Sequence, residues 1–216
     1  MKSNIFHTNE YKNVEKKIKD YINNQRDFLS HRTLSSTRAA GDAIQDLLAE
    51  NFEKILGKQK EYSANFARRA MADLAFSDKD GFYYIVDVKS HRLDTRFNMP
   101  NLTSVERLAR FYEDDKNYFV VLTVAYKMEG THMEVEKVHF VPIEFFSWDC
   151  LTIGALGWGQ IQIANSNKIM ITPQARRKWM LEMCDTLFEF YPSEIVKTKE
   201  RIIYFKKVKE KWLKKK

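Results

Sequence analysis

Apolar residues at helical spacing characterise the first part of the chain. Val14, Ile18, Tyr21 and Ile22 recur at intervals of three or four residues along one face, with lysines opposite. This spacing predicts an amphipathic helix within residues 9–30.

A second helix is predicted over residues 37–56. Ser36 is a suitable N-cap and Gly57 a suitable stop, because a serine side chain accepts a hydrogen bond from the first turn and glycine readily leaves the helical conformation. Asp46 and Glu50 lie one turn apart on a stripe beside the small and apolar residues.

Short apolar runs bounded by turn residues replace the helical spacing in the middle of the chain. They predict strands at residues 71–76, 82–89, 118–126 and 135–142, followed by a hairpin of residues 160–163 and 168–171. Between the second and third strands, Ser104 to Tyr112 predicts a short helix.

The last part of the chain is again helical in pattern. Thr172-Pro173 opens a helix that runs to about Phe190, and Tyr191-Pro192-Ser193 is expected to break it before a basic helix begins at residue 194. The order of elements predicts one α/β or α+β domain over residues 1–216, with a central mixed sheet flanked by helices. Its parts are N-terminal helices at 9–56, a core at 60–172 and C-terminal helices at 173–216.

Composition limits the class of protein and its partners. The net charge of +7 and the pI of about 9.2 favour a polyanionic partner. No apolar run is long enough for a membrane span, and the N-terminus lacks the apolar region of a signal peptide. Cys150 and Cys184 are too few for a disulfide framework or a zinc site, so we expect reduced thiols in a cytoplasmic protein.

Two carboxylates and a lysine supply the candidate chemistry. Asp73 interrupts the apolar run 71–76, and the strand that follows the next turn ends in Asp87-Val88-Lys89. Strand side chains alternate between faces, so the first and last residues of this triplet point to the same side. If the two runs pair as a hairpin, the two carboxylates lie side by side.

This arrangement suits magnesium. Mg²⁺ prefers oxygen ligands, which Asp73, Asp87 and the backbone carbonyl of Val88 would provide. A lysine held between carboxylates stays protonated, which favours electrostatic stabilisation of a phosphate by Lys89; a role as general base stays open. An Asp-X-Lys triplet alone is common at solvated strand ends, but an acid inside an apolar run is costly unless it pairs or binds a metal.

At these positions the chain resembles the PD-(D/E)XK type II restriction endonucleases, and more narrowly their blunt-cutting EcoRV and HincII branch. Asp87-Val88-Lys89-Ser90 is followed by Pro100-Asn101 and Ser104, then by Trp158-Gly159-Gln160-Ile161-Gln162-Ile163, in the order of that branch. Upstream, residues 39–47 resemble its helix with a glycine and a later acid. Ala72 replaces the proline of the motif, and Gln45 stands where the family has a helical glutamate. Asp46 or Glu50 is then the candidate third acidic ligand, unless a third acid is dispensable.

The resemblance implies a restriction-endonuclease-like fold and a Mg²⁺-dependent, site-specific DNA endonuclease. Asp73, Asp87 and Lys89 would be catalytic. The enzyme would act as a homodimer on double-stranded DNA at a short palindromic site, leaving 5′-phosphate, 3′-hydroxyl and blunt ends. A cognate DNA methyltransferase would share the site without needing to bind this chain, and no membrane partner is implied.

Polar residues on loops beyond the catalytic strand are the candidates for DNA contact, because amide, hydroxyl and guanidinium groups read base edges and phosphates. They are Asn98, Asn101, Thr103, Gln160, Gln162 and Asn165; Arg68 and Arg69, which precede the first catalytic strand, are further candidates. Two other functions remain open at this point: a nuclease of the same fold that recognises DNA structure or damage, and a DNA-binding protein without catalysis.

Overall fold

The computed structural model places helices where the N-terminal pattern predicts them, with different bounds. It describes residues 3–25, 29, 36–57, 60–62, 73–96, 99–129, 132–164 and 169–215. The helix predicted within residues 9–30 is α2 (Glu10–Asn23), which is shorter than the prediction, and a separate short helix, α1 (Asn4–His7), precedes it. The second is confirmed as α4 (Thr37–Leu56), in which the Ser36 hydroxyl accepts a hydrogen bond from the Ala39 amide at 3.2 Å and Gly57 ends the helix at a φ of 84°.

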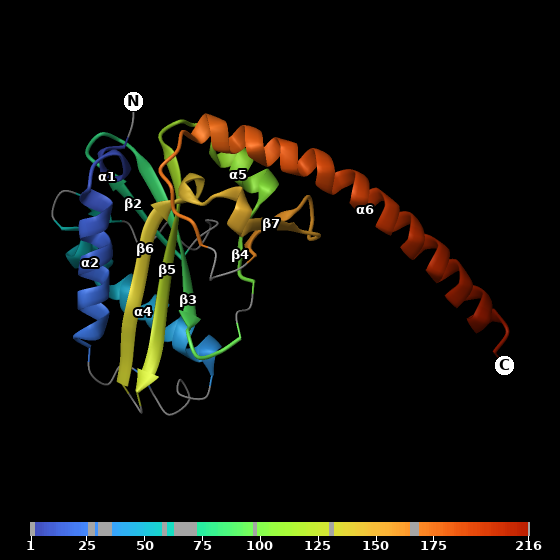
Figure 1. Cartoon of the computed structure of the whole chain (residues 1–216), viewed down its shortest axis with the longest axis horizontal. Helices are drawn as coiled ribbons and strands as arrows, with labels where there is room; N and C mark the ends of the chain where they lie inside the picture. The colour runs from blue at the N-terminus through green and yellow to red at the C-terminus, as the bar shows by residue number, and fades with distance from the viewer. Residues whose placement is uncertain are drawn as a thin grey trace.

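The central sheet is mixed and has the strand order β1-β2-β3-β5-β6 in the described part of the chain (Figure 1). Its strands are β1 (Lys60–Tyr62), β2 (Leu74–Asp78), β3 (Tyr83–Arg92), β5 (Asn117–Glu129) and β6 (His132–Pro142). Neighbouring strands are antiparallel except β3 and β5, which run parallel and are joined through β4 (Asn101–Ser104) and α5 (Val105–Phe111). A parallel pair needs such a crossover, because a tight turn reverses the chain.

Aromatic side chains on one face of this sheet form the centre of the core. Phe76 and Tyr84 lie opposite each other on β2 and β3 and stack with their centroids 4.5 Å apart. Phe52 of α4 and Phe6 of α1 pack onto them, so these helices cover this face. On the other face, Tyr83 meets Phe111 of α5. The alternation of side chains along β3 therefore separates the face covered by α1 and α4 from the face that carries Asp87 and meets α5.

Helix α2 covers the edge strand β6. The Asn23 side chain accepts a hydrogen bond from the Val135 amide at 2.7 Å, and the Glu15 carboxylate accepts one from the Phe140 amide at 2.8 Å. These contacts occupy backbone donors that an exposed edge would offer to another chain.

A second, smaller sheet has the order β4-β8-β7, formed with β8 (Gln160–Ile163) and β7 (Leu151–Gly154). The predicted hairpin of 160–163 with 168–171 is therefore wrong. Strand β8 pairs with β4 and β7, and Ile171 makes an isolated bridge to Phe146. The turn residues 165–168 lie outside the described residues.

The C-terminal region is one continuous helix, α6 (Arg176–Leu213), which curves away from the body (Figure 1). The predicted break at Tyr191-Pro192-Ser193 is wrong. Proline removes one backbone donor, but the Ser193 hydroxyl donates to the Phe190 carbonyl and the Tyr191 hydroxyl donates to the Trp158 carbonyl, so the turn is supported on both sides.

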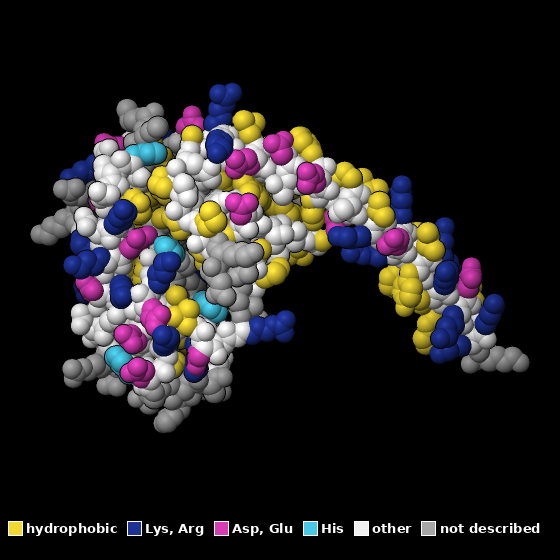
Figure 2. Space-filling model, in the orientation of Figure 1, with side chains coloured by type: hydrophobic (Ala, Val, Ile, Leu, Met, Phe, Trp, Pro, Cys, Tyr) yellow, Lys and Arg dark blue, Asp and Glu magenta, His cyan; other side chains and the backbone are white. Residues whose placement is uncertain are grey.

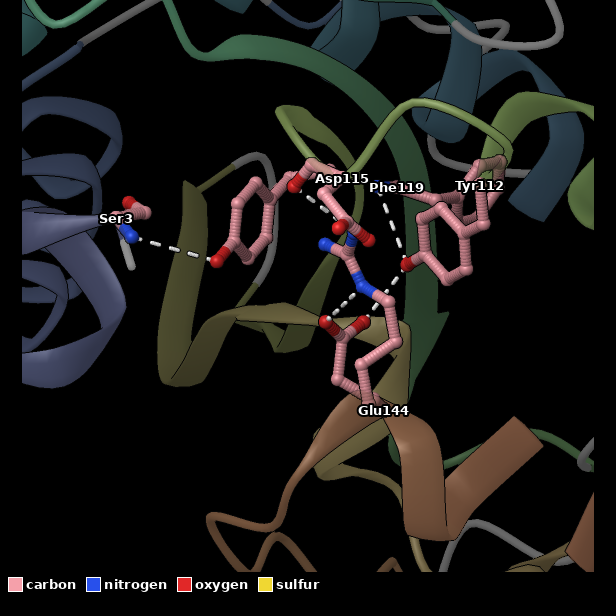
Figure 3. Close-up of polar contacts among 7 residues, drawn as sticks. Ser3, Tyr112, Asp115, Phe119 and Glu144 are labelled. Atoms are coloured by element: carbon pink, nitrogen blue, oxygen red, sulfur yellow. Dashed lines mark hydrogen bonds and ion pairs between the residues drawn. The ribbon is translucent and has the colours of Figure 1, made fainter. Parts of the chain in front are cut away.

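A buried polar network anchors the start of α6. Glu144 is 3% exposed and lies in the short 3₁₀ helix η2 (Ile143–Phe145). Its carboxylate accepts hydrogen bonds from the Tyr112 hydroxyl at 2.7 Å and from Arg176 Nε at 3.1 Å. Figure 3 shows Tyr112 and Glu144 converging on this network. The Arg176 guanidinium lies over the rings of Tyr112 and Tyr118, 4.0 Å and 4.4 Å from their centroids. The first turn of α6 is thereby fixed to η2 and the sheet.

The elements form a single α+β domain with a mixed sheet flanked by helices. None of the described helices combines the length and apolar character that crossing a bilayer requires. Both cysteines are free: Cys150 is buried and Cys184, on α6, is half-buried.

Candidate functional site

The predicted hairpin is confirmed and brings the first acid to the second strand. The register pairs Leu74 with Val86, and the Asp73 amide donates to the Val86 carbonyl at 3.0 Å. The turn forms because Asp78 accepts hydrogen bonds from two following amides and Gly81 adopts a φ of 77°, which glycine takes without strain. Asp73 therefore lies at the position opposite Asp87.

Hydrogen bonds to both oxygens hold the Asp73 carboxylate. Oδ1 accepts from Gln45 Nε2 at 2.6 Å, and Oδ2 accepts from the Val88 amide at 2.7 Å. The carbonyl and amide of one strand residue point to the same edge, so the Val88 carbonyl lies on the Asp73 side of β3. The Asp73 carboxylate and the Val88 carbonyl, two of the predicted ligand groups, therefore meet at this edge of β3, and Gln45 of α4 orients the carboxylate.

Asp87 is a buried carboxylate with one free oxygen. It is 5% exposed; its Oδ1 accepts a hydrogen bond from Lys89 Nζ at 2.7 Å, whereas its Oδ2 is buried without a hydrogen-bonding partner in the described part of the chain. Burial, aided by the neighbouring Asp73, raises the pKa of Asp87 to about 7 against the lowering effect of Lys89. An unpaired carboxylate oxygen beside a second carboxylate fits a divalent cation. The charge of the cation would offset both the burial of the Asp87 carboxylate and its repulsion by Asp73.

Lys89 connects these carboxylates to a cleft. Its side chain is 25% exposed and, with Gln45 and Val88, lines a cavity of about 470 Å³ between α4 and strands β3, β5 and β6. The charged side chains that line the described cleft are mostly basic: Arg38, Lys89, Arg92, Arg96 and Lys137 outnumber Asp42 and Glu136. Such a surface favours a polyanion, because the summed positive charge attracts phosphates.

In the described part of the chain, no third acid joins Asp73 and Asp87. Asp46 and Glu50 are both exposed on α4. Among the described residues, no group of three or more His, Cys, Asp or Glu side chains is arranged to hold a metal. The predicted role of Asp46 or Glu50 as a ligand is therefore not supported, and the α4 side chain that reaches the site is the neutral Gln45.

Gln45 is the site residue that sequence reasoning left without a role. The sequence feature that could have indicated its role is Gly41, one turn earlier on the same face of α4. A Cβ at Gly41 would lie 2.8 Å from Ser90 Oγ, so glycine allows α4 to approach β3 closely. That approach brings the Gln45 amide to Asp73.

Gln45→Glu tests whether this position can restore a third acid. We expect a lower melting temperature without metal, since the new carboxylate replaces a hydrogen bond to Asp73 with like-charge repulsion. Added Mg²⁺ should raise the melting temperature more in the variant than in the wild type, because three carboxylates bind the cation more tightly than two. Thermal unfolding with and without Mg²⁺ measures both effects, and Gln45→Ala separates lost contact from added charge. An equal Mg²⁺ shift in Gln45→Glu and wild type would contradict the assignment.

The candidate DNA-reading residues on the small sheet differ in accessibility. Asn101 is exposed, and its Oδ1 accepts a hydrogen bond from Gln162 Nε2 at 2.5 Å. Gln160 and Gln162 are half-buried on one face of β8, while Ile161 and Ile163 are buried on the other. The two glutamines and Asn101 thus form a polar face of the small sheet.

Thr103 does not belong to that face. It is 4% exposed and pairs with Ile161 on the buried side, which does not suit the predicted contact with a base. The cause is an irregularity in the pairing between Asn101 and Thr103, which shifts the alternation of side chains. Arg68, Arg69, Asn98 and Asn165 lie outside the described residues.

No model of a known protein family matches this chain, and no curated protein is similar enough to count as a match.

Proposed function

We propose that the protein is a Mg²⁺-dependent type II restriction endonuclease that hydrolyses both strands of duplex DNA at a short palindromic site. The observation that carries the proposal is the buried Oδ2 of Asp87, which has no hydrogen-bonding partner among the described residues and lies beside Asp73, with Lys89 linking the pair to a basic cleft. The products would be blunt ends with 5′-phosphate and 3′-hydroxyl groups.

Asp73, Asp87 and the Val88 carbonyl would hold Mg²⁺, which when bound neutralises charge on a phosphate and makes a coordinated water more acidic. Gln45 and the Val88 amide fix the orientation of Asp73. Lys89 holds Asp87 Oδ1 and presents an ammonium group towards the cleft, where it would stabilise negative charge on the scissile phosphate.

The proposal extends to the partners of the site. The net charge of +7 and the basic cleft suit the phosphates of double-stranded DNA. One such site cuts one strand, so a two-fold homodimer would be needed to cut both strands of a palindrome. A methyltransferase that modifies the same sequence would protect the host DNA.

Digestion of a long duplex of known sequence tests this function. The wild-type protein with Mg²⁺ should give discrete fragments, and EDTA should abolish them, because both carboxylates need the cation to act on a phosphate. Mapping the fragment ends gives the site and the stagger. A preference for branched or damaged DNA would indicate a nuclease that recognises DNA structure and not sequence. Binding of DNA without cleavage at any Mg²⁺ concentration would indicate a DNA-binding protein without catalysis.

A further inference from the structure

The distal part of α6 exposes an unusual amount of apolar surface. The helix is buried against the body at Trp179 and Met183 and then extends beyond it (Figure 1). Large apolar side chains are exposed along its length, among them Phe188 at 71%, Ile202 at 54% and Phe205 at 64%. Figure 2 shows hydrophobic side chains along the projecting helix, with lysine and arginine gathered towards its far end.

The apolar residues follow a seven-residue repeat. Leu181, Phe188, Ile195 and Ile202 are spaced seven residues apart and define the first core position of a heptad, which the polar Lys209 continues. The second core position, three residues later, holds Cys184, Tyr191, Thr198, Phe205 and Trp212. A repeat of 3.5 residues per turn is the pattern of a helix that supercoils against another helix. The stripe from residue 181 to 212 is about 47 Å long at 1.5 Å per residue, which is ample for a stable pair.

Charge along α6 indicates the partner and its direction. Residues 179–196 contain four acids, Glu182, Asp185, Glu189 and Glu194, and no lysine or arginine. Residues 197–215 contain nine lysines and arginines against Glu200 and Glu210. Two parallel copies would bring the basic halves together. Two antiparallel copies bring each acidic half against a basic half, so the helix is electrostatically complementary to itself in reverse.

We propose that α6 pairs with α6 of a second copy of this chain as an antiparallel coiled coil. The register that aligns the core positions places Phe188 against Phe205 of the partner subunit and Leu181 against Trp212 of the partner subunit. Beside this core, Asp185 lies near Lys206 of the partner subunit. Duplex DNA is a weaker match for this stripe, because the acidic half of α6 would repel it. The inference does not depend on nuclease activity.

Oligomeric mass, measured without DNA or metal, tests the pairing. Wild-type protein should have twice the chain mass by light scattering at micromolar concentration. Ile195→Glu/Ile202→Glu places charges in the core of the stripe and should weaken association at least a hundredfold, giving a monomer. The matched control is Val196→Glu/Ile203→Glu, in which the adjacent, equally exposed apolar residues change but lie off the stripe. It should stay dimeric, and circular dichroism should show all three proteins folded.

Disulfide trapping with an added thiol oxidant tests the direction. Cys184 lies in the core position, so a parallel pair would place the two copies of Cys184 together and cross-link the wild type. The antiparallel register instead places Cys184 near residue 209 of the other copy. Lys209→Cys should therefore cross-link as a dimer on non-reducing gels, whereas wild type and Lys209→Cys/Cys184→Ser should not.

Four results would overturn the proposal: a monomeric wild type, a dimer that survives Ile195→Glu/Ile202→Glu, monomerisation of the off-stripe control, or cross-linking of the wild type through Cys184. If Ile195→Glu/Ile202→Glu lost affinity for DNA while its mass stayed that of the wild type, α6 would be a nucleic-acid surface instead. None of these measurements involves cleavage, so the pairing and the nuclease proposal can fail separately.

Discussion

Asp87→Asn is expected to abolish Mg²⁺-dependent cleavage and at the same time to stabilise the metal-free protein at pH 8. The substitution keeps the size of the side chain and an oxygen that can accept the hydrogen bond from Lys89, but it removes the negative charge that the cation needs. We expect cleavage of duplex DNA to fall by about a thousandfold or more, as for other losses of a group that stabilises charge in the transition state.

The stability gain follows from the raised pKa of Asp87. Burial raises this pKa from an ordinary value of 3.8 to about 7, so the folded protein binds a proton that the unfolded chain has already released. Stability from this group is therefore full below pH 3.8 and is lost as the pH rises towards 7, with a total effect of about 4 kcal/mol. An asparagine side chain at this position does not titrate, so its contribution to stability does not change over this pH range. The free energy of unfolding of the wild type, measured in urea, should therefore fall over this pH range relative to that of Asp87→Asn.

Magnesium supplies a readout that is independent of cleavage. Binding only to the folded state, it should raise the melting temperature of wild type at pH 8 but leave Asp87→Asn nearly unchanged. Asp46→Asn is the matched control, because it removes an exposed carboxylate from α4 that does not reach the site. An Asp87→Asn protein that still cuts, or that retains the full Mg²⁺ shift, would show that the metal site is elsewhere.

Glu144→Ala is expected to cost about 3–5 kcal/mol of folding free energy, the largest loss of stability that we expect from a change outside the apolar core. The carboxylate is 3% exposed and serves both Arg176 and the Tyr112 hydroxyl. Its removal leaves the Arg176 charge largely buried without its counter-charge and the tyrosine hydroxyl without its acceptor. Because Arg176 begins α6, the start of that helix should lose protection from hydrogen exchange as well.

A double-mutant cycle distinguishes this network from simple packing. Adding Arg176→Met to Glu144→Ala removes the unpaired charge while keeping an apolar side chain near Tyr112 and Tyr118. The double variant should be more stable in urea than Glu144→Ala alone, since the charge that the first substitution leaves unpaired is gone. Additive losses would mean that the ion pair contributes nothing and that only packing holds α6 in place.

Local rules predicted the candidate catalytic pair. The alternation of side chains along a strand placed Asp87 and Lys89 on one face, and the turn ending at Gly81 fixed the hairpin that brings Asp73 opposite. These features involve residues close in sequence, where backbone geometry leaves few choices. The helices at 37–56 and 104–112 follow from the same kind of information, because apolar spacing and serine caps act within one or two turns.

Features that depend on distant residues were predicted less well. Pro192 signals a helix break, yet the hydroxyl of Tyr191 and the loop at Trp158, 33 residues away in sequence, support a continuous helix. Thr103 reads as an exposed loop residue, yet an irregularity in its pairing with β8 turns it inward. In both cases a contact with another element outweighs the local preference.

The sequence by itself determined the residues of the candidate site and their relation along one hairpin: two acids and a lysine at strand spacing. Only the tertiary structure decided that Asp87 Oδ2 is buried without a partner among the residues it describes, that Gln45 holds Asp73, and that α6 extends without a break beyond the body. The physical reason is that periodicity specifies which face a side chain occupies. Burial, electrostatic environment and partner choice are set by whatever distant elements pack against that face.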